Sequence, residues 1–314
     1  MRILFTSVGR RVELIQAFKS AAERLNVDVS IYGADCSTSA PALLFCDHTV
    51  LTPLIKSGNY IDFLQKYCME NQIDALIPTI DTDLLILAEN KNGFGRTKVI
   101  VSDYDKVALC RDKRFTTEFF HSVGLQAPAC CDDYRDYKHS YPAFIKPKDG
   151  SSSINAYKVS NAQELYEISN RVPEYIVQPY VEGNEYTVDI FCDFDGNPIY
   201  ITPRERLAVR AGEVLKTRIT QDDCMIEEAK RLCEAFKPVG QITVQLIREK
   251  NTGINYYIEI NPRFGGGAPL SIKAGADSAE ALLRILQNER LTYIANAAED
   301  GAVYSRFDQS VRVL

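Results

Sequence analysis

The chain has 314 residues, of which 42 are acidic and 36 are basic, so its formal net charge at pH 7 is −6. This acidic balance argues against a nucleic-acid surface, because such surfaces cluster lysine and arginine side chains. A chain of this length can bury a sizeable core, and it predicts two or three lobes.

Targeting signals and cysteine content indicate the compartment. No apolar run approaches the ~18 residues that a membrane span needs, and the first residues turn polar too early for a signal peptide. The nine cysteines are scattered without a Cys-x-x-Cys pair, and only three histidines accompany them, so a zinc site is not expected. We therefore expect a soluble, cytoplasmic protein with reduced thiols and with neither a membrane nor a nucleic-acid partner.

The first hundred residues alternate between strand and helix patterns. Residues 3–6 predict an apolar strand, and apolar side chains then recur at helical spacing over residues 12–25. Further strands are predicted at residues 29–32, 75–78 and 99–101. This alternation is typical of a small parallel sheet.

Charged side chains follow two of these strands, and ligands of parallel sheets collect beyond the carboxyl ends of the strands. The candidates for substrate contacts are Arg10, Arg11, Asp81 and Asp83. Two other interpretations stay open: the arginines are solvated in a first helical turn, or Asp81 caps a helix. A dinucleotide site is not expected, because the glycine-spaced run at residues 93–98 lacks a third glycine and precedes a strand.

The next segment predicts a phosphate-binding loop. A polar run that contains Lys113 begins an amphipathic helix ending at Gly124, although a lysine at a helix start is usually just solvated. Beyond it, an apolar strand ends in Lys146 and leads into a loop of small residues that includes Ser151 and Ser152. Such a loop can approach a polyphosphate closely and surround it with an ammonium group and backbone N–H donors. It is not a P-loop, and an exposed turn between two strands is the alternative.

A strand, a break and a second strand are predicted over residues 175–189, with proline and glycine at the break. Extended backbone there can offer N–H and C=O groups to an adenine edge, and Glu185 can accept hydrogen bonds from both ribose hydroxyls. The adenine candidates are Gln178, Pro179, Tyr180 and Val181. A purely structural Glu185 in a half-exposed strand is the alternative.

Cations follow a predicted hairpin whose strands lie at residues 187–193 and 199–202. They are concentrated in residues 203–218, where they could neutralise a triphosphate, and Arg204 and Arg210 are the candidates. A solvated strand would carry the same charges, and the sequence does not say which arginine reaches the phosphates.

The most informative segment is the hairpin at residues 245–263, which turns at Asn-Thr-Gly. Side chains alternate faces along a strand, so Glu259 and Asn261 point the same way, and Gln245 can face them across the hairpin. Tyr257 is expected to continue their row. Oxygen ligands of this kind suit Mg²⁺ (or Mn²⁺), which shares its coordination sphere with nucleotide phosphates, although both side chains could also be merely solvated. The residues expected to pack behind the row are Ile258 and Ile260.

Two further features follow the hairpin. Arg263 could reach a transferring phosphoryl group. Backbone N–H groups of the glycine-rich turn, at Gly265 and Gly266, could hold a substrate carboxylate or an acyl phosphate. The tail at residues 302–309 alternates like a strand and is expected to complete the last sheet.

The run Ile-Glu-Ile-Asn-Pro-Arg at residues 258–263, with Gln245 upstream, resembles the metal-binding end of the ATP-grasp superfamily. It is most similar to the carbamoyl-phosphate-synthetase large-subunit-like branch. The resemblance implies that Gln245, Glu259 and Asn261 bind Mg²⁺ and that Arg263 contacts phosphate.

The same resemblance implies roles for the residues of the nucleotide segment. Lys113 and Lys146 would bind the phosphates of ATP, and the loop after Lys146 would close as a lid. Arg263 and Lys146 are the residues expected to act in catalysis. Gln178 departs from the pattern, because many members carry glutamate there.

The resemblance covers nearly the whole chain and implies its fold, which combines α/β and α+β architecture. We expect a parallel-sheet lobe at residues 1–110, a small nucleotide lobe at residues 111–180, and an antiparallel-sheet lobe with the metal site at residues 181–314. No internal repeat or glutaminase segment is visible, so a single ATP-grasp unit is expected.

The implied activity is that of a ligase. ATP would activate a small carboxylate as an acyl phosphate, and a small-molecule amine would displace the phosphate to form an amide. Three alternatives stay open: an enzyme that phosphorylates carbamate or bicarbonate, a phosphotransferase that releases a stable product, and an ATP-binding sensor without chemistry. A homodimer is the default expectation for the assembly.

Overall fold

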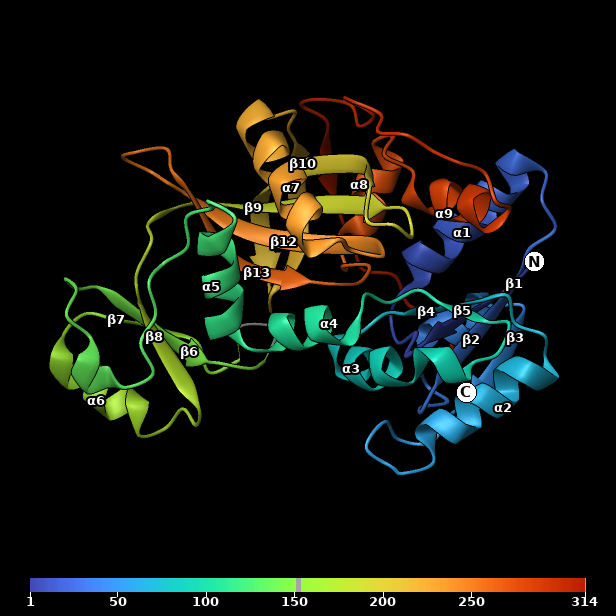
Figure 1. Cartoon of the computed structure of the whole chain (residues 1–314), viewed down its shortest axis with the longest axis horizontal. Coiled ribbons are helices and arrows are strands. Elements are labelled where there is room, and N and C mark those ends of the chain that lie inside the picture. Colours follow the sequence, from blue (N-terminus) through green and yellow to red (C-terminus); the bar gives the residue numbers. More distant parts are fainter. Residues whose placement is uncertain (151–153, 314) are drawn as a thin grey trace.

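The protein consists of lobes built on separate sheets (Figure 1). The computed structural model describes residues 1–150 and 154–313. In this part of the chain the strands form a five-stranded, a six-stranded and a three-stranded sheet. The five-stranded and three-stranded sheets lie toward opposite ends of the long axis in Figure 1, and the six-stranded sheet lies between them.

Apolar strands build the parallel sheet of the N-terminal lobe, as the alternating pattern predicts. The strand order is β3-β2-β1-β4-β5, and every neighbouring pair is parallel. Ile3 and Phe5 belong to one core cluster and Leu4 to another, because the central strand is covered on both faces. The strands are β1 (Arg2–Thr6), β2 (Ser30–Asp35), β3 (His48–Leu51), β4 (Ala75–Pro78) and β5 (Lys98–Val99).

Helices cover this sheet. They are α1 (Val12–Leu25), α2 (Tyr60–Glu70) and α3 (Asp81–Asn90), with the 3₁₀ turns η1 (Pro41–Phe45) and η2 (Lys91–Gly93). Two more helices, α4 (Tyr104–Arg111) and α5 (Lys113–Ser122), lead toward the other lobes. Among the helices of the described residues, none combines the length and the apolar character that crossing a membrane requires.

The small lobe is an antiparallel sheet with the order β7-β6-β8. Its helix begins with reciprocal capping: the Asn161 side chain accepts a hydrogen bond from the Glu164 N–H, and the Glu164 carboxylate accepts one from the Ser160 N–H. The elements are β6 (Ala143–Pro147), β7 (Tyr157–Val159), α6 (Ala162–Ser169), β8 (Tyr175–Pro179) and the turn η3 (Tyr134–Asp136).

The large sheet has the order β13-β12-β9-β10-β11-β14. The pairing of β14 with β11 confirms that part of the tail completes this sheet. The strands are β9 (Gly183–Cys192), β10 (Pro198–Arg210), β11 (Glu213–Ile219), β12 (Gly240–Glu249), β13 (Asn255–Asn261) and β14 (Val303–Ser305). The helices of this lobe are α7 (Asp223–Phe236), α8 (Ala268–Lys273) and α9 (Ser278–Leu286).

Helix α5 packs on the large sheet. Phe120 of α5 shares a core with Leu232 of α7 and with Val244 and Tyr257 of the sheet, and the Phe120 and Tyr257 ring centroids lie 5.3 Å apart. The boundary expected from the sequence assigns residues 111–180 to the nucleotide lobe, whereas this packing associates α5 with the large sheet. The lobe boundaries stay a prediction.

A β-bulge changes which side chains of β13 face the neighbouring cavity. Gln245 lies opposite Glu259, as predicted, but the register shifts after this pair and Ile258 becomes an extra residue. The prediction that Tyr257 continues the row of Glu259 is therefore wrong, and Tyr257 is buried in the core. Ile258 lines a cavity with Glu259 instead of packing behind it, whereas Ile260 is buried as predicted.

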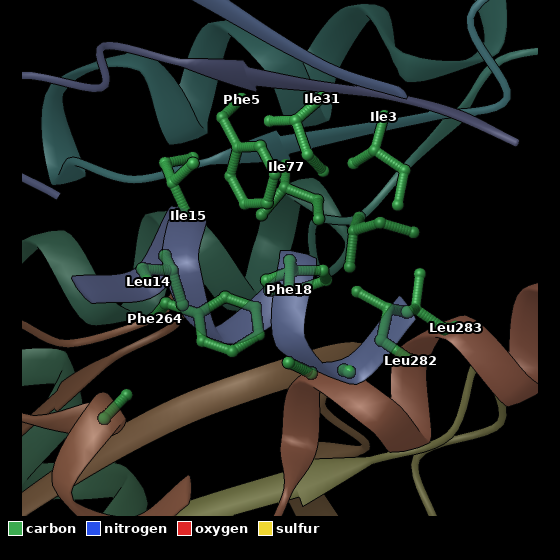
Figure 2. Packing of buried hydrophobic residues seen from close by; sticks show 14 of the residues in the cluster. Ile3, Phe5, Leu14, Ile15, Phe18, Ile31, Ile77, Phe264, Leu282 and Leu283 are labelled. Carbon is green, nitrogen blue, oxygen red and sulfur yellow. The ribbon is translucent and has the colours of Figure 1, made fainter. Parts of the chain in front are cut away.

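A hydrophobic core joins the N-terminal lobe to the large-sheet lobe through α1. Figure 2 shows Phe18 of α1 between Phe5 of the parallel sheet and Phe264, which follows β13. The ring centroids lie 5.0 Å apart for Phe5 and Phe18 and 5.8 Å apart for Phe18 and Phe264. Leu282 and Leu283 of α9 complete this side of the core. The two lobes are thus held together by one continuous apolar cluster.

A substitution at Gly183 tests how closely β9 packs against β12. A Cβ atom added there would lie 1.9 Å from the Arg248 carbonyl oxygen, so the strands would have to move apart. We expect Gly183→Ala to lower the free energy of unfolding by about 1–3 kcal/mol, measured by urea denaturation. Gly58→Ala is the control, because its Cβ would meet nothing within 4 Å. Equal stability of Gly183→Ala and the wild type would contradict the packing.

Candidate active site

Two cavities adjoin the strand that carries the predicted metal ligands. The inter-sheet cavity, about 210 Å³, lies between the small sheet and the large sheet, and its polar lining includes Lys113, Lys146, Glu185, Arg206, Gln245 and Glu259. The polar cavity, about 320 Å³, lies between the N-terminal lobe and the large sheet, and its charged lining includes Arg11, Asp81, Arg204, Arg206, Glu213, Glu259 and Arg263. Arg206, Gly212, Gln245 and Glu259 line both cavities. A group held by these residues is therefore accessible from both cavities.

The polar cavity lies where parallel sheets usually bind ligands. The chain places β2 and β3 on one side of β1 and β4 and β5 on the other, so the strand order reverses between β1 and β4. Arg11 follows β1, and residues 80–82 follow β4, and all of them line the cavity. The N-terminal sheet thus supplies one wall of this cavity and the metal-binding strands supply another.

The predicted metal ligands come together as expected. Gln245 and Glu259 are directly opposed on β12 and β13, and the Asn261 side-chain amide donates a hydrogen bond to the Glu259 carboxylate, 2.9 Å. The set provides one carboxylate and two amide oxygens, which is the chemistry of a hard divalent cation. One carboxylate leaves half of the charge of Mg²⁺ for another anion to neutralise, so the residues fit a metal shared with a phosphate.

Two buried lysines provide positive charge in the inter-sheet cavity. Lys146 at the end of β6 is buried, and burial together with the neighbouring Lys113 lowers its pKa to about 8. Burial also lowers the pKa of Lys113, whose ammonium group donates to the Gly150 carbonyl oxygen, 2.8 Å. Two buried cations that line one cavity favour an anionic ligand there, because an opposite charge nearby stabilises the charged form of each lysine. Ser151 and Ser152, which the sequence also predicts here, lie outside the described residues.

The predicted adenine segment follows β8. The Gln178 side chain is buried and its Nε2 donates to the Pro128 carbonyl oxygen, 3.0 Å, so an adenine amino group would have to donate to Oε1. Pro179 ends β8, the Tyr180 N–H donates to the Pro142 carbonyl oxygen, 3.1 Å, and Val181 lies in the break before β9. Glu185 lies on β9 beyond this break, lines the inter-sheet cavity and is about half exposed.

Arg204 and Arg210 do not supply free cations as predicted. Arg204 is buried, with its Nε 2.7 Å from Asp189 Oδ2, and Asp189 also accepts hydrogen bonds from Thr243 and Ser271. Arg204 therefore stabilises the large sheet, although it also lines the polar cavity and its Nη1 has no hydrogen-bond partner among the described residues. Arg210 lies on the exposed end of β10 and pairs with Asp308 at 3.0 Å.

Arg206 is the cation that the sequence analysis missed. It lines both cavities, and its side chain is only 7% exposed. Its Nη2 donates to the Gly212 carbonyl oxygen, 2.9 Å, and its Nε lies 3.4 Å from Glu185 Oε2 without a hydrogen-bond partner among the described residues. Alternation along β10 could have identified Arg206, because it shares a face with Arg204. Register shifts after Arg206 then break the alternation, and Arg210 leaves the row.

Asp81 and Arg263 form an ion pair between the lobes. Arg263 Nε and Nη2 donate to the two Asp81 oxygens at 2.9 and 2.6 Å, and both side chains are largely buried. Asp81 is the first residue of α3 and Ile80 is the N-cap, so the capping interpretation of Asp81 is wrong. Asp81 instead orients the guanidinium group that the sequence predicts for phosphate.

Of the other substrate candidates on the N-terminal sheet, only Arg11 lines the polar cavity. Asp83 is fully buried and accepts hydrogen bonds from Thr6, Ser7 and Tyr60, and burial raises its pKa to about 6. Arg10 is exposed on the turn before α1. The prediction for Asp83 is corrected because α3 turns this side chain toward the sheet, away from the cavity.

The glycine-rich turn is in close contact with charged groups. A Cβ atom at Gly266 would lie 2.0 Å from Glu213 Oε2, and one at Gly267 would lie 2.5 Å from Arg204 Nη2. At Gly265 it would lie 2.8 Å from Thr243 Oγ1. A larger residue at these positions would have to displace one of these side chains, and both predicted glycines, Gly265 and Gly266, line the polar cavity.

Two families of known proteins match successive parts of the chain. Residues 3–102 match the family described as PylC-like, N-terminal domain, and residues 110–267, half of the chain, match the ATP-grasp domain. Over 181 residues the chain is 24% identical to 3-methyl-D-ornithine–L-lysine ligase of Methanosarcina acetivorans, covering 57% of the chain and 46% of that protein. The chain thus spans less than half the length of this relative.

Two further relatives connect the chain with ligases and with the branch expected from the sequence. It is 25% identical to D-alanine–D-alanine ligase of a Marinomonas species, covering 74% of the chain and 86% of that enzyme. It is 28% identical to the carbamoyl phosphate synthase large chain of Agathobacter rectalis, covering 62% of the chain and 20% of that protein.

Solved structures confirm the fold. The biotin carboxylase domain of 2-oxoglutarate carboxylase from Hydrogenobacter thermophilus, crystallised with MgADP and bicarbonate, superposes with a TM-score of 0.78 and 16% identity, covering 96% of this chain and 73% of that one. L-amino acid ligase from Bacillus licheniformis gives a TM-score of 0.73 at 18% identity, covering 91% of this chain and 74% of that one. With a matching family over half of its length, the predicted arrangement of lobes and the expected ligand strands, the chain belongs to the ATP-grasp family.

Proposed function

We propose that the protein is an ATP- and Mg²⁺-dependent ligase that activates a small carboxylate as an acyl phosphate and joins it to an amine. The observation that carries this proposal is the junction of the two cavities at Arg206, Gln245 and Glu259. ATP in the inter-sheet cavity would place its γ-phosphate at the junction, and the acceptor would reach it from the polar cavity. The ligases among the relatives support the same reaction class.

Nucleotide binding rests on charge and position. Lys113 and Lys146 would compensate the phosphates, and Glu185 would accept hydrogen bonds from the ribose. The backbone after β8 would meet the adenine edge, with Gln178 Oε1 as a further acceptor.

Gln245, Glu259 and Asn261 would hold Mg²⁺ (or Mn²⁺), which supplies charge neutralisation at the phosphates when it is bound. Arg206 would stabilise the charge on the transferring phosphoryl group. Asp81 holds Arg263 by two hydrogen bonds, so that guanidinium group is oriented beside the same cavity before substrate binds.

The chemistry needs no nucleophilic side chain. A carboxylate oxygen of the substrate forms a bond to the γ-phosphorus, the bond to the β-phosphate oxygen breaks, and ADP leaves. The amine nitrogen then bonds to the acyl carbon, the carbon–oxygen bond to phosphate breaks, and the amine proton passes to solvent. The backbone N–H group at Gly265 would stabilise the acyl oxygen, and Gly266 lies on the Arg11 side of the same turn.

Phosphorylation of bicarbonate or carbamate is the second candidate, favoured by the carbamoyl phosphate synthase relative. The polar cavity of about 320 Å³ is much roomier than a four-atom ion requires and falls at the low end for small-molecule sites. We therefore place the carboxylate–amine ligase first. A cytoplasmic location and a homodimer stay predictions.

The test is release of ADP and phosphate with Mg²⁺, screened against small carboxylates and amines singly and in pairs, with bicarbonate alone in a separate arm. Stimulation by a carboxylate–amine pair supports the ligase. Stimulation by bicarbonate alone supports the second candidate. ATP binding without turnover in any arm supports a sensor.

Glu259→Gln tests the metal set. Removing the carboxylate charge should lower Mg²⁺-dependent ATP turnover by about 100-fold or more while the melting temperature stays near that of the wild type. Glu118→Gln, on the exposed side of α5, is the control and should keep full turnover. Near-normal activity of Glu259→Gln would refute the metal assignment.

The variants Arg206→Met and Arg210→Met test which arginine of β10 contacts the phosphates. The structure favours Arg206, whereas Arg210 is one of the two candidates from the sequence. We expect Arg206→Met to lower kcat/KM for ATP by about 100-fold, because its guanidinium group lines both cavities. Arg210 lies at the exposed end of β10, so its variant should stay within about twofold of the wild type. The reverse order would overturn the role of Arg206.

The lowered pKa of Lys146 leads us to expect that nucleotide binding depends on pH. Its pKa in the nucleotide-free protein is about 8, so the ammonium form prevails below that pH and the neutral amine above it. Affinity for a non-hydrolysable ATP analogue with Mg²⁺ should therefore weaken as the pH rises through 8, by up to ~10-fold per pH unit, in calorimetric titrations. Lys146→Met should remove this dependence, and an unchanged slope in the variant would contradict the prediction.

A further inference from the structure

Arg11 is a partly buried guanidinium group with weak partners; its side chain is 19% exposed. It lies at the start of α1, where the parallel sheet meets the polar cavity. Its Nη1 lies 3.5 Å from Glu213 Oε1, and its Nη2 donates to the Thr79 carbonyl oxygen at 3.5 Å. Both contacts are at the outer limit for a hydrogen bond. The pKa of Arg11 is lowered, first by burial and then by the nearby charge of Arg263.

The surrounding carboxylates are already shared among other cations. Asp81 is held by two short hydrogen bonds from Arg263. Glu213 lies 3.5 Å from Arg306 Nη1 as well as 3.5 Å from Arg11, so it serves two guanidinium groups.

Glu13 does not make up the difference. It pairs with Arg306 at 3.3 Å and with Lys273 at 2.8 Å, so it too is divided between two cations. The ion pairs that continue from Arg11 therefore connect three cations with two carboxylates, and Arg263 and Asp81 form a balanced pair of their own. The members of the connected group are Arg11, Arg306, Lys273, Glu213 and Glu13.

Arg11 is the one of these three cations that lines the polar cavity. It lines this cavity alone, whereas Gln245 and Glu259 of the metal set line both cavities and so lie at their junction. The Gly266 backbone packs directly against Arg11 and Glu213, which leaves the guanidinium group beside the turn that closes the cavity. An anion at Arg11 is thus separate from the group that reacts beside Glu259.

We propose that Arg11 binds a carboxylate of the substrate that does not itself react, and that this anchoring carboxylate displaces Glu213 from Arg11. The inference rests on the proposed ligase function and names its substrate class. At least one substrate carries a carboxylate in addition to the group that forms the new bond. That carboxylate belongs either to a dicarboxylic acid that is activated or to an amino acid that supplies the amine.

Two variants test the anchor in opposite directions. Arg11→Met removes the cation and should raise KM for the anchored substrate about 10- to 100-fold, the effect of one charge-assisted hydrogen bond, with kcat within about twofold. Arg11→Lys should restore part of the affinity. Glu213→Gln removes the competing carboxylate and should lower KM severalfold.

Matched pairs of substrates identify which one carries the anchor. Succinate is compared with butyrate as the activated acid, and L-alanine is compared with ethylamine as the amine. The member of the sensitive pair that lacks the extra carboxylate should bind weakly to the wild type and show no further loss in Arg11→Met. An equal rise of KM for both members would overturn the anchor.

Other outcomes also overturn the proposal. If Glu213→Gln raises KM, Glu213 holds a substrate cation and the subsite is not anionic. If Arg11→Met lowers kcat and leaves KM unchanged, Arg11 acts on the reacting group. Calorimetric titration with succinate or L-alanine in the absence of ATP measures binding of the anchoring carboxylate independently of turnover. The wild type could bind these substrates without turning over ATP, and Arg11→Met could abolish that binding. This result would refute the ligase function but support the carboxylate-binding role of Arg11.

Discussion

The polar cavity of the proposed site depends on the apolar core that joins the N-terminal lobe to the large-sheet lobe through α1. Phe18 packs between Phe5 and Phe264, and these rings link the parallel sheet to the segment that follows β13. Arg11 directly precedes α1, and Arg263 directly precedes Phe264. Burying these aromatic rings therefore also brings the two arginines to one cavity. The non-directional hydrophobic effect holds the lobes together, while the ion pairs orient the polar groups.

Charge is distributed unevenly in this cavity, and the imbalance has a chemical meaning. In the polar cavity Arg204 pairs with Asp189 and supports the sheet. In the inter-sheet cavity Arg206, Lys113 and Lys146 form no hydrogen bond with a carboxylate among the described residues. Buried cations are costly unless an anion accompanies them. Bound phosphates would offset the free energy that burying these cations costs in the free protein. ATP binding would therefore be favoured, as expected for a member of the ATP-grasp family.

Backbone irregularities decide which side chains take part. The bulge at Ile258 turns Tyr257 into the core and brings Ile258 into the inter-sheet cavity beside Glu259. Register shifts after Arg206 in β10 remove Arg210 from the row that faces the cavity. Close approach at Gly266 and Gly267 lets the turn after β13 lie against charged groups. Each of these features lies next to the proposed site, where bulges commonly redirect side chains.

The sequence by itself determined the local elements and the ligand strands. Alternation along the hairpin placed Gln245 opposite Glu259, and the strand ending at Lys146 and the helix beginning at Lys113 were found where predicted. These features depend on neighbours in the chain, whose geometry has a fixed period. Only the tertiary structure decided that Arg210 leaves the row of Arg206, that Asp83 is buried and that Asp81 holds Arg263. Those outcomes depend on residues far away in the chain, because burial, register shifts and ion pairs are set by which segments pack together.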